Sequence, residues 1–518
     1  MSGIVAVAQP NKHHNLVSRM DLIGHRGPLG RAIVRYGQAT LGEVRGAPLG
    51  MWTGRKEGCR AAFDGAVFDR AGGNDRACDV SQMIEDAFER SGPAFLSQLD
   101  GPFALAIGCE DGVFAARDPV GIAPLYYGFR DGVFCCASEA KALLGWASEV
   151  REFPPGHYFS PEEGLVRFVD SEHRPGESEA NPAGSLLEAL SGAVLKRVAL
   201  SESPACLLSG GVDSSIIAAI AARGAERLKT FAIGLDGAPD LRCARQVAEH
   251  IGSEHFEVRV KPETLLRVLP DVIYHLESFD ALLVRSSLTN YLLCGVVSDH
   301  ADGVLSGEGS DELFAGYDYM KQVPTSCLND ELADITGRLH NTGLQRVDRC
   351  AGAHGLKAFV PFLDPEVRSL ARSMGPDLKI RREDGEAVDK WVLRRASEPL
   401  LPDGIARRPK AKFWQGTGVT DVMAGYAESR ISDEAFRQAR TLSDGTVLNT
   451  REECLYYNVF TGHFGQLEDY SLCLLYTSDA ADDLLCVDLG GRRILKKKTT
   501  SPTSIIPSSN HNYPVRTR

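Results

Sequence analysis

The stretch Pro204–Ser215 reads PACLLSGGVDSS and is followed by the apolar run IIAAIAARG. An apolar segment that ends in Ser-Gly-Gly is typical of a buried strand, and the run after it is typical of a helix. The two glycines allow a sharp turn and a close approach of the backbone to an anion. The N–H groups at the start of the helix, with the hydroxyls of Ser214 and Ser215, would face that anion. The order strand, SGGxDS and helix therefore predicts a phosphate-binding loop.

Asp213 is the unusual residue of this loop, because a carboxylate beside a phosphate is repulsive unless a cation lies between them. We therefore expect Mg²⁺ at Asp213, shared with the oxygens of a pyrophosphate group. The alternative is an ordinary Gly-Gly turn with a helix-capping Asp or Ser. The combination of strand, SGGxDS and helix disfavours that alternative.

Strands and helices alternate along the chain around this loop. Strands are expected at Ala205–Leu208, Lys229–Gly234 and Gly303–Leu305, and helices at Ser215–Arg223 and Leu241–Ile251. The alternation predicts an α/β domain over residues 186–470, with helices on both faces of a parallel sheet. Ligands of such sheets bind beyond the carboxyl ends of the strands.

Residues 1–158 have a different pattern, in which short β-type runs such as GIVAVA and PFALAIG are separated by glycines. This pattern predicts an α+β domain of antiparallel sheets, with a helix near Asp79–Arg90. Residues 159–185 are charged, contain Pro and Gly, and are expected to be a linker. Residues 471–518 are expected to be an unstructured tail, because Cys473–Asp482 resembles a translated sequencing adapter. A natural disordered tail is the alternative.

The composition limits the classes of function. The chain has 518 residues, a net charge of −12, 43% hydrophobic residues and 13 cysteines without CxxC spacing. These values suit a soluble globular protein with reduced thiols, and they argue against a nucleic-acid or membrane-surface binder. No run of apolar residues is long enough for a membrane helix, so a cytoplasmic location is expected.

A second motif, Gly303–Tyr317, reads GVLSGEGSDELFAGY. Together with SGGVDSS, it resembles the nucleotide site of asparagine synthetases, and the resemblance covers residues 1 to about 470. It includes the stretches Thr230–Leu241, Asp271–Asp280, VPFLD at Val360–Asp364, KWVLR at Lys390–Arg394, RPKAKFWQGTG at Arg408–Gly418, and HRGP at His25–Pro28. The resemblance implies an N-terminal glutamine amidotransferase type 2 domain with an Ntn-hydrolase-like β sandwich. It also implies a C-terminal PP-loop ATP pyrophosphatase domain.

By this resemblance, ATP and Mg²⁺ are the cofactors, and the substrates are small molecules in a homodimeric enzyme. The implied ATP-binding residues are Leu208, Ser209, Gly210, Gly211, Asp213, Ser214, Ser215, Ile233, Ser306 and Gly307. The implied metal ligands are Asp213 and Asp311, two carboxylates that can hold a cation against the leaving pyrophosphate. A substrate carboxylate would attack the α-phosphate, and an amine would then displace AMP from the acyl-adenylate.

The resemblance also implies three catalytic residues, Glu308, Lys410 and Arg346. Glu308 aligns with the glutamate that helps to deprotonate attacking ammonia, and Lys410 aligns with a lysine that stabilises charge on the intermediate. Lys412 is a neighbouring candidate. A helix cap near Asp311 is the alternative for Glu308, and a solvated loop charge is the alternative for Lys410. β-Lactam synthetases carry Tyr at the position of Glu308 and Glu at that of Arg346, so both positions here take the asparagine synthetase form.

The glutaminase half departs from the family pattern. The nucleophilic cysteine at position 2 is Ser2, whose hydroxyl is far less acidic than a thiol. The Asn-Gly of the oxyanion hole is Asp64-Gly65, which places negative charge where negative charge must be stabilised. The arginine that binds the carboxylate of glutamine aligns with Val44, one place from Arg45. We therefore expect an inactive glutaminase domain and synthesis from ammonia or another amine.

Two departures concern the acceptor. The family's Glu-x-Arg before VPFLD is Lys357-Ala358-Phe359, and an aspartate three places before Arg346 is Gly343. These changes of charge and shape predict an acceptor that can differ from aspartate.

The leading hypothesis is an AMP-forming amide ligase. One alternative is a natural-product ligase of the β-lactam synthetase or lasso-peptide cyclase type. The other is a non-catalytic ATP-binding scaffold, which the intact Asp213, Glu308 and Asp311 disfavour.

Overall fold

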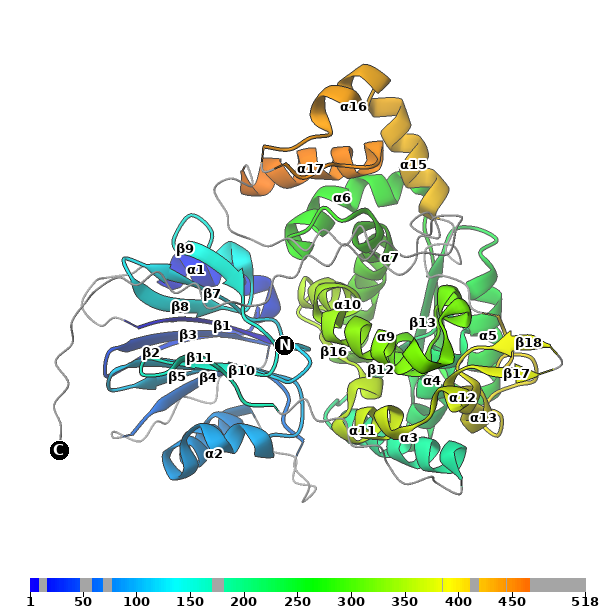
Figure 1. Ribbon diagram of the computed structural model, residues 1–518, viewed down its shortest axis with the longest axis horizontal. Helices are drawn as coiled ribbons and strands as arrows, with labels where there is room; N and C mark the ends of the chain where they lie inside the picture. The colour runs from blue at the N-terminus through cyan, green and yellow to red at the C-terminus, as the bar shows by residue number, and fades with distance from the viewer. Residues whose placement is uncertain are drawn as a thin grey trace. The chain divides into compact units, whose positions relative to one another are not determined.

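The computed structural model describes residues 1–8, 16–46, 58–68, 77–169, 181–383, 385–409, 419–443 and 445–465. They belong to one compact unit, Met1–Thr477 (Figure 1). Lys410, Lys412 and the expected tail lie outside the described residues.

Two antiparallel sheets form the N-terminal half. The first sheet has the order β2-β3-β1-β8-β7-β9 and contains β1 (Ser2–Val7), β2 (Gly30–Tyr36), β3 (Ala39–Arg45), β7 (Tyr126–Arg130), β8 (Val133–Ala137) and β9 (Ser148–Glu152). The second has the order β11-β10-β6-β5-β4 and contains β4 (Arg60–Gly65), β5 (Phe103–Cys109), β6 (Gly112–Arg117), β10 (His157–Ser160) and β11 (Gly164–Arg167).

The alternation of side chains along β1 explains how these sheets stack. Ile4 and Ala6 face the second sheet, whereas Val5 and Val7 pack with Leu16 of helix α1 (Leu16–Leu22). On the far side of the second sheet, helix α2 (Ala77–Ser91) covers β4 (Figure 1). The result is a β sandwich between helices, which confirms the predicted α+β class.

The second sheet extends past the boundary expected at residue 158. Strand β11 pairs with β10 inside the segment expected to be a linker, with Leu165 opposite Phe159. The run GLVR is too short for its alternation to be recognised from the sequence. Helix α3 (Pro182–Val198) then begins after Asn181, whose side chain accepts a hydrogen bond from the Gly184 N–H.

The C-terminal half is built on a parallel sheet of order β14-β13-β12-β15-β16. Its strands are β12 (Pro204–Leu207), β13 (Lys229–Gly234), β14 (Glu254–Arg259), β15 (Gly303–Leu305) and β16 (Lys357–Phe359), and every pairing between them is parallel. The strand order reverses between β12 and β15, so the loops after these two strands flank the crevice where such sheets bind ligands.

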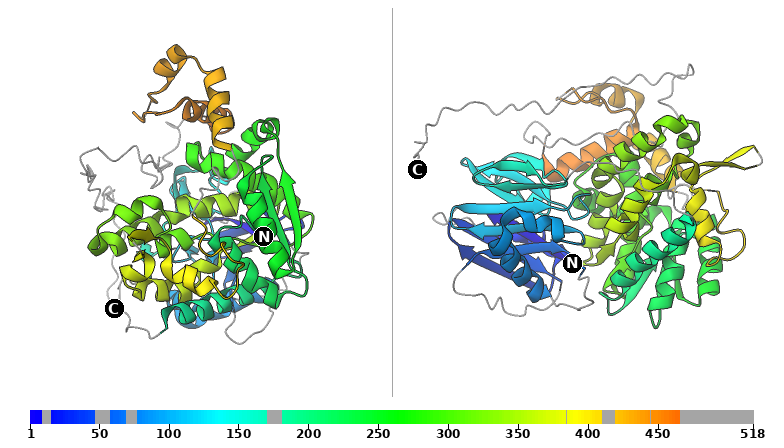
Figure 2. Two further views of the ribbon diagram at one scale, coloured as in Figure 1. Left: turned by 90° about the vertical axis from the view of Figure 1, so that its right-hand side faces the viewer. Right: turned by 60° about the horizontal axis from the view of Figure 1, so that its bottom comes forward.

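Helices cover both faces of this sheet (Figures 1 and 2), which confirms the predicted α/β class. One face packs against α3, α4 (Val212–Gly224), α5 (Pro239–Ile251), α11 (Pro365–Ser373) and α13 (Trp391–Ser397). The other packs against α6 (Pro262–Leu276), α7 (Ala281–Ser298), α15 (Val419–Arg430) and α17 (Arg451–Phe464). The remaining elements are α8 (Ser310–Phe314), α9 (Thr325–Arg338), α10 (Gly343–Gly352), α12 (Pro376–Lys379), α16 (Asp433–Ala439), β17 (Arg381–Glu383) and β18 (Glu386–Val388).

Helix α7 is long and apolar enough to cross a membrane by length and composition alone, yet most of it is buried inside the protein. The ten cysteines whose side chains the structure describes are all free thiols.

Candidate active site

Two loops meet at the switch point of the parallel sheet. The first leads from β12 through Ser209, Gly210 and Gly211 into α4, and the second leads from β15 through Ser306 towards α8. In the first loop, the Ser209 N–H donates to Ser214 Oγ at 3.1 Å, and the Gly211 N–H donates to Ser209 Oγ at 3.3 Å. These bonds hold the loop in a tight curve that ends at the N-terminus of α4, where backbone N–H groups suit an anion.

Glycines allow the loops to pack closely. Gly210 has φ +71° and lies so near α5 that an added Cβ would sit 2.4 Å from Cys243 Cβ. At Gly307, an added Cβ would lie 3.0 Å from both Asp213 Cβ and the Ser214 nitrogen. The second loop therefore lies directly against Asp213.

This packing brings the two predicted metal ligands to one cation. Lys390 Nζ lies 2.6 Å from Asp213 Oδ2 and forms an ion pair with Asp311 Oδ1, while Ser310 Oγ donates to Asp213 Oδ1 at 2.7 Å. The Lys390 side chain is only 1% exposed, whereas the carboxylates are 24% and 23% exposed. Burial alone would lower the pKa of Lys390, but Asp213 and Asp311 hold it above its ordinary value.

Lys390 opens the KWVLR motif, but no role for it was predicted from the sequence. Its αL backbone, with φ +52°, ends the segment before α13 and directs the ammonium between two loops that are distant in sequence. Its place at the start of the KWVLR motif was a signal in the sequence, but that signal did not indicate which residues Lys390 contacts.

The carboxylates fit a magnesium site shared with phosphate groups. Because Asp213 and Asp311 converge on one cation, they are close enough to ligate one metal ion from two loops. Mg²⁺ is commonly held by one or two carboxylates, with substrate phosphates and water completing its octahedron. Negative charge is concentrated here: burial, with Asp311 and Glu308 nearby, raises the pKa of Glu312 to about 7.

Glu308 lies beside these carboxylates and is held by Arg346. Arg346 Nη2 donates to Glu308 Oε1 at 2.6 Å, and this carboxylate raises the pKa of Arg346 despite the opposing effect of burial. The Glu308 side chain lies against Gly343, where an added Cβ would be 2.3 Å from Glu308 Oε1. Helix α8 has Gly309 as its N-cap, and no side-chain hydrogen bond caps it, so Glu308 is not used as a helix cap.

The remaining predicted ATP residues differ in exposure. Leu208 and Ile233 are buried at the ends of β12 and β13, and Ser306 donates its N–H to the Phe359 carbonyl. The Ser215 hydroxyl is buried and has no hydrogen-bond partner among the described residues. Arg408, from the RPK motif, donates to the Ser209 carbonyl at 3.1 Å and thereby supports the phosphate loop.

Ser2 and Asp64, which align with the family's glutaminase residues, belong to a buried polar cluster. Ser2 Oγ donates to Asp64 Oδ1 at 3.2 Å, and Ser138 Oγ donates to Asp64 Oδ2 at 3.0 Å. Arg26 Nη2 lies 3.1 Å from Asp64 Oδ2. Burial raises the pKa of Asp64, and Arg26 opposes this rise. The side chain of an ionised Asp accepts hydrogen bonds and donates none, unlike the Asn that the family pattern has at this position.

The two positions nearest to the family's carboxylate-binding arginine are both buried. Val44 is fully buried in the core of the N-terminal half. The Arg45 guanidinium donates to both carboxylate oxygens of Glu43, each at 2.7 Å, and both side chains are buried.

Lys357 and Phe359, which the sequence associates with the acceptor, lie at opposite ends of the short strand β16. Lys357 pairs with Gly303 at the opposite end of the strands from Ser306. Its side chain lines a cavity shared with Ser2 and Asp64, and burial lowers its pKa. Phe359 is buried in the core of the C-terminal half. Strand direction, which the sequence motif alone does not show, therefore puts Lys357 at the far end of the strands, whereas Phe359 pairs with Leu305 next to the loop that carries Glu308.

Comparison with known proteins agrees with this geometry. The asparagine synthase family profile matches residues 185–336 and 328–458, and a glutamine amidotransferase domain profile matches residues 71–145. Asparagine synthetase [glutamine-hydrolyzing] 2 of Arabidopsis thaliana is 34% identical over 407 residues, covering 74% of this chain and 70% of the relative. The Triphysaria versicolor asparagine synthetase [glutamine-hydrolyzing] is 35% identical over 419 residues, covering 75% of this chain and 70% of the relative.

Proposed function

Because the chain belongs to the asparagine synthase family, we propose that this carbon–nitrogen ligase activates a carboxylate as an acyl-adenylate and then aminates it. Pyrophosphate leaves in the first step and AMP in the second. The observation that carries this proposal is the meeting of Asp213 and Asp311 at one cation, with Glu308 on the adjoining loop. This arrangement supplies a place for a charged leaving group next to a base.

Different residues serve the adenylation step and the amination step. The N–H groups at the N-terminus of α4 would bind phosphate oxygens, and Asp213 and Asp311 would hold Mg²⁺, which would neutralise charge on the pyrophosphate. Lys390 adds a second, fixed positive charge at the same place. Glu308 accepts a hydrogen bond from Arg346, which orients its carboxylate, and it would accept a proton from the attacking ammonia. Lys410, by its alignment, would stabilise the tetrahedral intermediate.

We further propose that free ammonia or another amine is the nitrogen donor. Three features of the N-terminal half support this: Ser2 in place of a thiol, Asp64 as an acceptor in the oxyanion position, and Arg45 paired with Glu43. Aspartate is the first acceptor to test, and related carboxylic acids follow.

The test compares ammonium chloride with glutamine, using the full-length protein with Mg-ATP and aspartate. We expect equal amounts of asparagine, AMP and pyrophosphate with ammonium, and no asparagine with glutamine. Asparagine formed from glutamine would overturn the proposed donor. The absence of AMP and pyrophosphate with every amino-acid acceptor would overturn the proposed reaction.

Two variants test whether Glu308 acts in the amination step. Glu308→Gln should lower amination by about 100-fold or more, because it removes the general base. It should retain pyrophosphate exchange into ATP, which reports adenylate formation. Glu188→Gln, an exposed position on α3, is the matched control and should behave as the wild type.

A further inference from the structure

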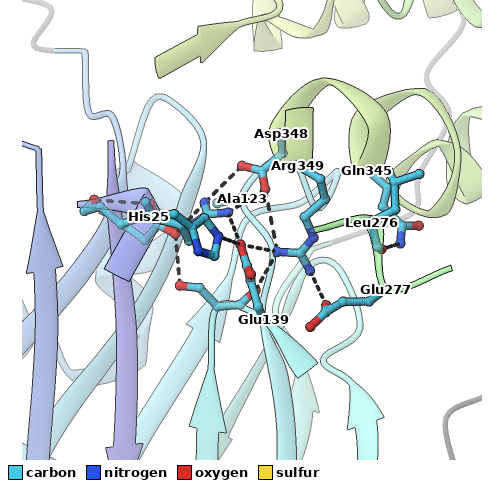
Figure 3. Close-up of polar contacts among 12 residues, drawn as sticks. His25, Ala123, Glu139, Leu276, Glu277, Gln345, Asp348 and Arg349 are labelled. Atoms are coloured by element: carbon cyan, nitrogen blue, oxygen red, sulfur yellow. Dashed lines mark hydrogen bonds and ion pairs between the residues drawn. The ribbon is translucent and has the colours of Figure 1, made fainter. Parts of the chain in front are cut away.

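Helix α10 connects the synthetase site to the N-terminal half. Arg346 on this helix holds Glu308, while Asp348 and Arg349 reach the N-terminal half (Figure 3). Successive residues of a helix are fixed relative to one another by its backbone hydrogen bonds. A displacement of Asp348 therefore also displaces Arg346.

Arg26 of the N-terminal half grips Asp348 with two hydrogen bonds. Arg26 Nη1 donates to Asp348 Oδ2 at 2.8 Å, and Nη2 donates to Oδ1 at 3.0 Å. The same guanidinium lies 3.1 Å from Asp64 and 3.1 Å from Glu139, and it has no exposed area. Bidentate pairing fixes direction as well as distance, so Arg26 restricts both the position and the orientation of the helix at this point.

Arg349 provides a second attachment on the same helix. Its Nη1 lies 3.1 Å from Glu139 Oε1, and its Nη2 donates to Glu277 Oε2 at 3.0 Å (Figure 3). Gln345 also donates to the Leu276 carbonyl at 2.8 Å. Glu139 thus contacts both arginines, one from each half of the protein, and ties the two attachments into one network.

We propose that the N-terminal half, through Arg26, positions helix α10 and thereby aligns Arg346 and Glu308 for amination. Arg26, Asp64 and Asp348 are the positioning residues. Asp64 disables the oxyanion position, and at the same time it gives the buried Arg26 another carboxylate partner. This inference rests on the proposed synthetase function, and it gives the N-terminal half a role that needs no glutamine hydrolysis.

Asp348→Asn tests the attachment because it removes the charge and retains the size of the side chain. We expect faster hydrogen exchange at the amides of residues 343–352. We also expect a fall in kcat with ammonium of about 10-fold or more, because small displacements of catalytic groups carry large rate penalties. The KM for ATP should stay within about twofold of the wild type, since α10 supplies none of the phosphate-loop groups. Asp64→Asn should shift exchange and kcat in the same direction and serves as a second variant.

Glu452→Gln is the matched control. Glu452 forms a buried two-bond pair with Arg285, between α17 and α7. Loss of this pair should lower stability without changing exchange in α10 or the split between kcat and KM. A double-mutant cycle adds a readout specific to positioning: Arg346→Lys should cost less in the Asp348→Asn background than in the wild type.

Unchanged exchange in α10 of both Asp348→Asn and Asp64→Asn would overturn the inference. Faster exchange with unchanged kcat would show that the attachment exists without positioning the catalytic pair, and would overturn it as well. A wild type that makes no product would refute the proposed function, and with it the catalytic part of this inference. The exchange measurement would still decide whether Arg26 holds the helix.

Discussion

Gly210→Ala is the sharpest perturbation of the phosphate loop. The backbone of Gly210 has φ +71°, and an added Cβ would lie 2.4 Å from Cys243 Cβ, 2.5 Å from the Cys243 carbonyl carbon and 2.6 Å from the Ala244 nitrogen. Two of these three atoms belong to the backbone of α5. Truncating Cys243 therefore cannot relieve the contact, and either the loop or the helix must move.

The cost has two parts. A non-glycine residue in the left-handed region costs about 1–2 kcal/mol, and an overpacked contact in a dense core costs about 1–3 kcal/mol. We expect Gly210→Ala to lower the free energy of unfolding by about 2–5 kcal/mol, measured by urea denaturation. Gly252→Ala is the matched control: its φ is +68°, but no atom lies within 4 Å of the added Cβ. Gly252→Ala should therefore lower the free energy of unfolding only by the cost of the left-handed backbone, about 1–2 kcal/mol.

The same variant should weaken ATP binding, because the loop that moves carries the phosphate-binding N–H groups. Isothermal titration with Mg-ATP should show at least a tenfold loss of affinity for Gly210→Ala, about 1.4 kcal/mol, and none for Gly252→Ala. Equal losses of stability in the two variants would refute the packing argument. Unchanged ATP affinity in Gly210→Ala would refute the assignment of this loop to phosphate.

Three further predictions concern charge. Lys390→Met should lower the free energy of unfolding by about 3 kcal/mol in the absence of metal, because two carboxylates lose their shared cation. In urea denaturation, added MgCl₂ should raise the stability of the variant more than that of the wild type. Burial alone would raise the pKa of Glu152, but Arg117 holds it at about 2, below the ordinary 4.5. The contribution of ionised Glu152 to stability is therefore present above pH 4.5 and lost as pH falls towards 2. In urea denaturation, Glu152→Gln should lower the free energy of unfolding by about 3 kcal/mol at pH 6 and by much less at pH 3. Ser2→Cys should not confer glutamine-dependent synthesis, because Asp64 still accepts rather than donates hydrogen bonds. The assay measures the release of glutamate from glutamine. Release at the rate of an active glutamine-hydrolysing relative would contradict this prediction.

Local patterns in the sequence determined the class of each half and the identity of the phosphate loop. Strand, glycine turn and helix follow one another within Pro204–Gly224, so neighbouring residues alone specify this unit. The same holds for the loop after β15, where GEGSDE follows a short apolar strand. Asp213 could be selected in this way, because a carboxylate in a phosphate loop requires a cation. Glu308 and Asp311 were selected from the resemblance of the second loop to asparagine synthetases.

The tertiary structure alone decided which distant charges meet. Lys390 reaches Asp213 across 177 residues, and Arg26 reaches Asp348 across 322 residues. Periodicity reports which face of an element is buried, but not which element packs against that face. The pairing of charges depends on how strands and helices are placed in three dimensions, and for that reason the bridging lysine and the grip of Arg26 on helix α10 emerged only from the fold.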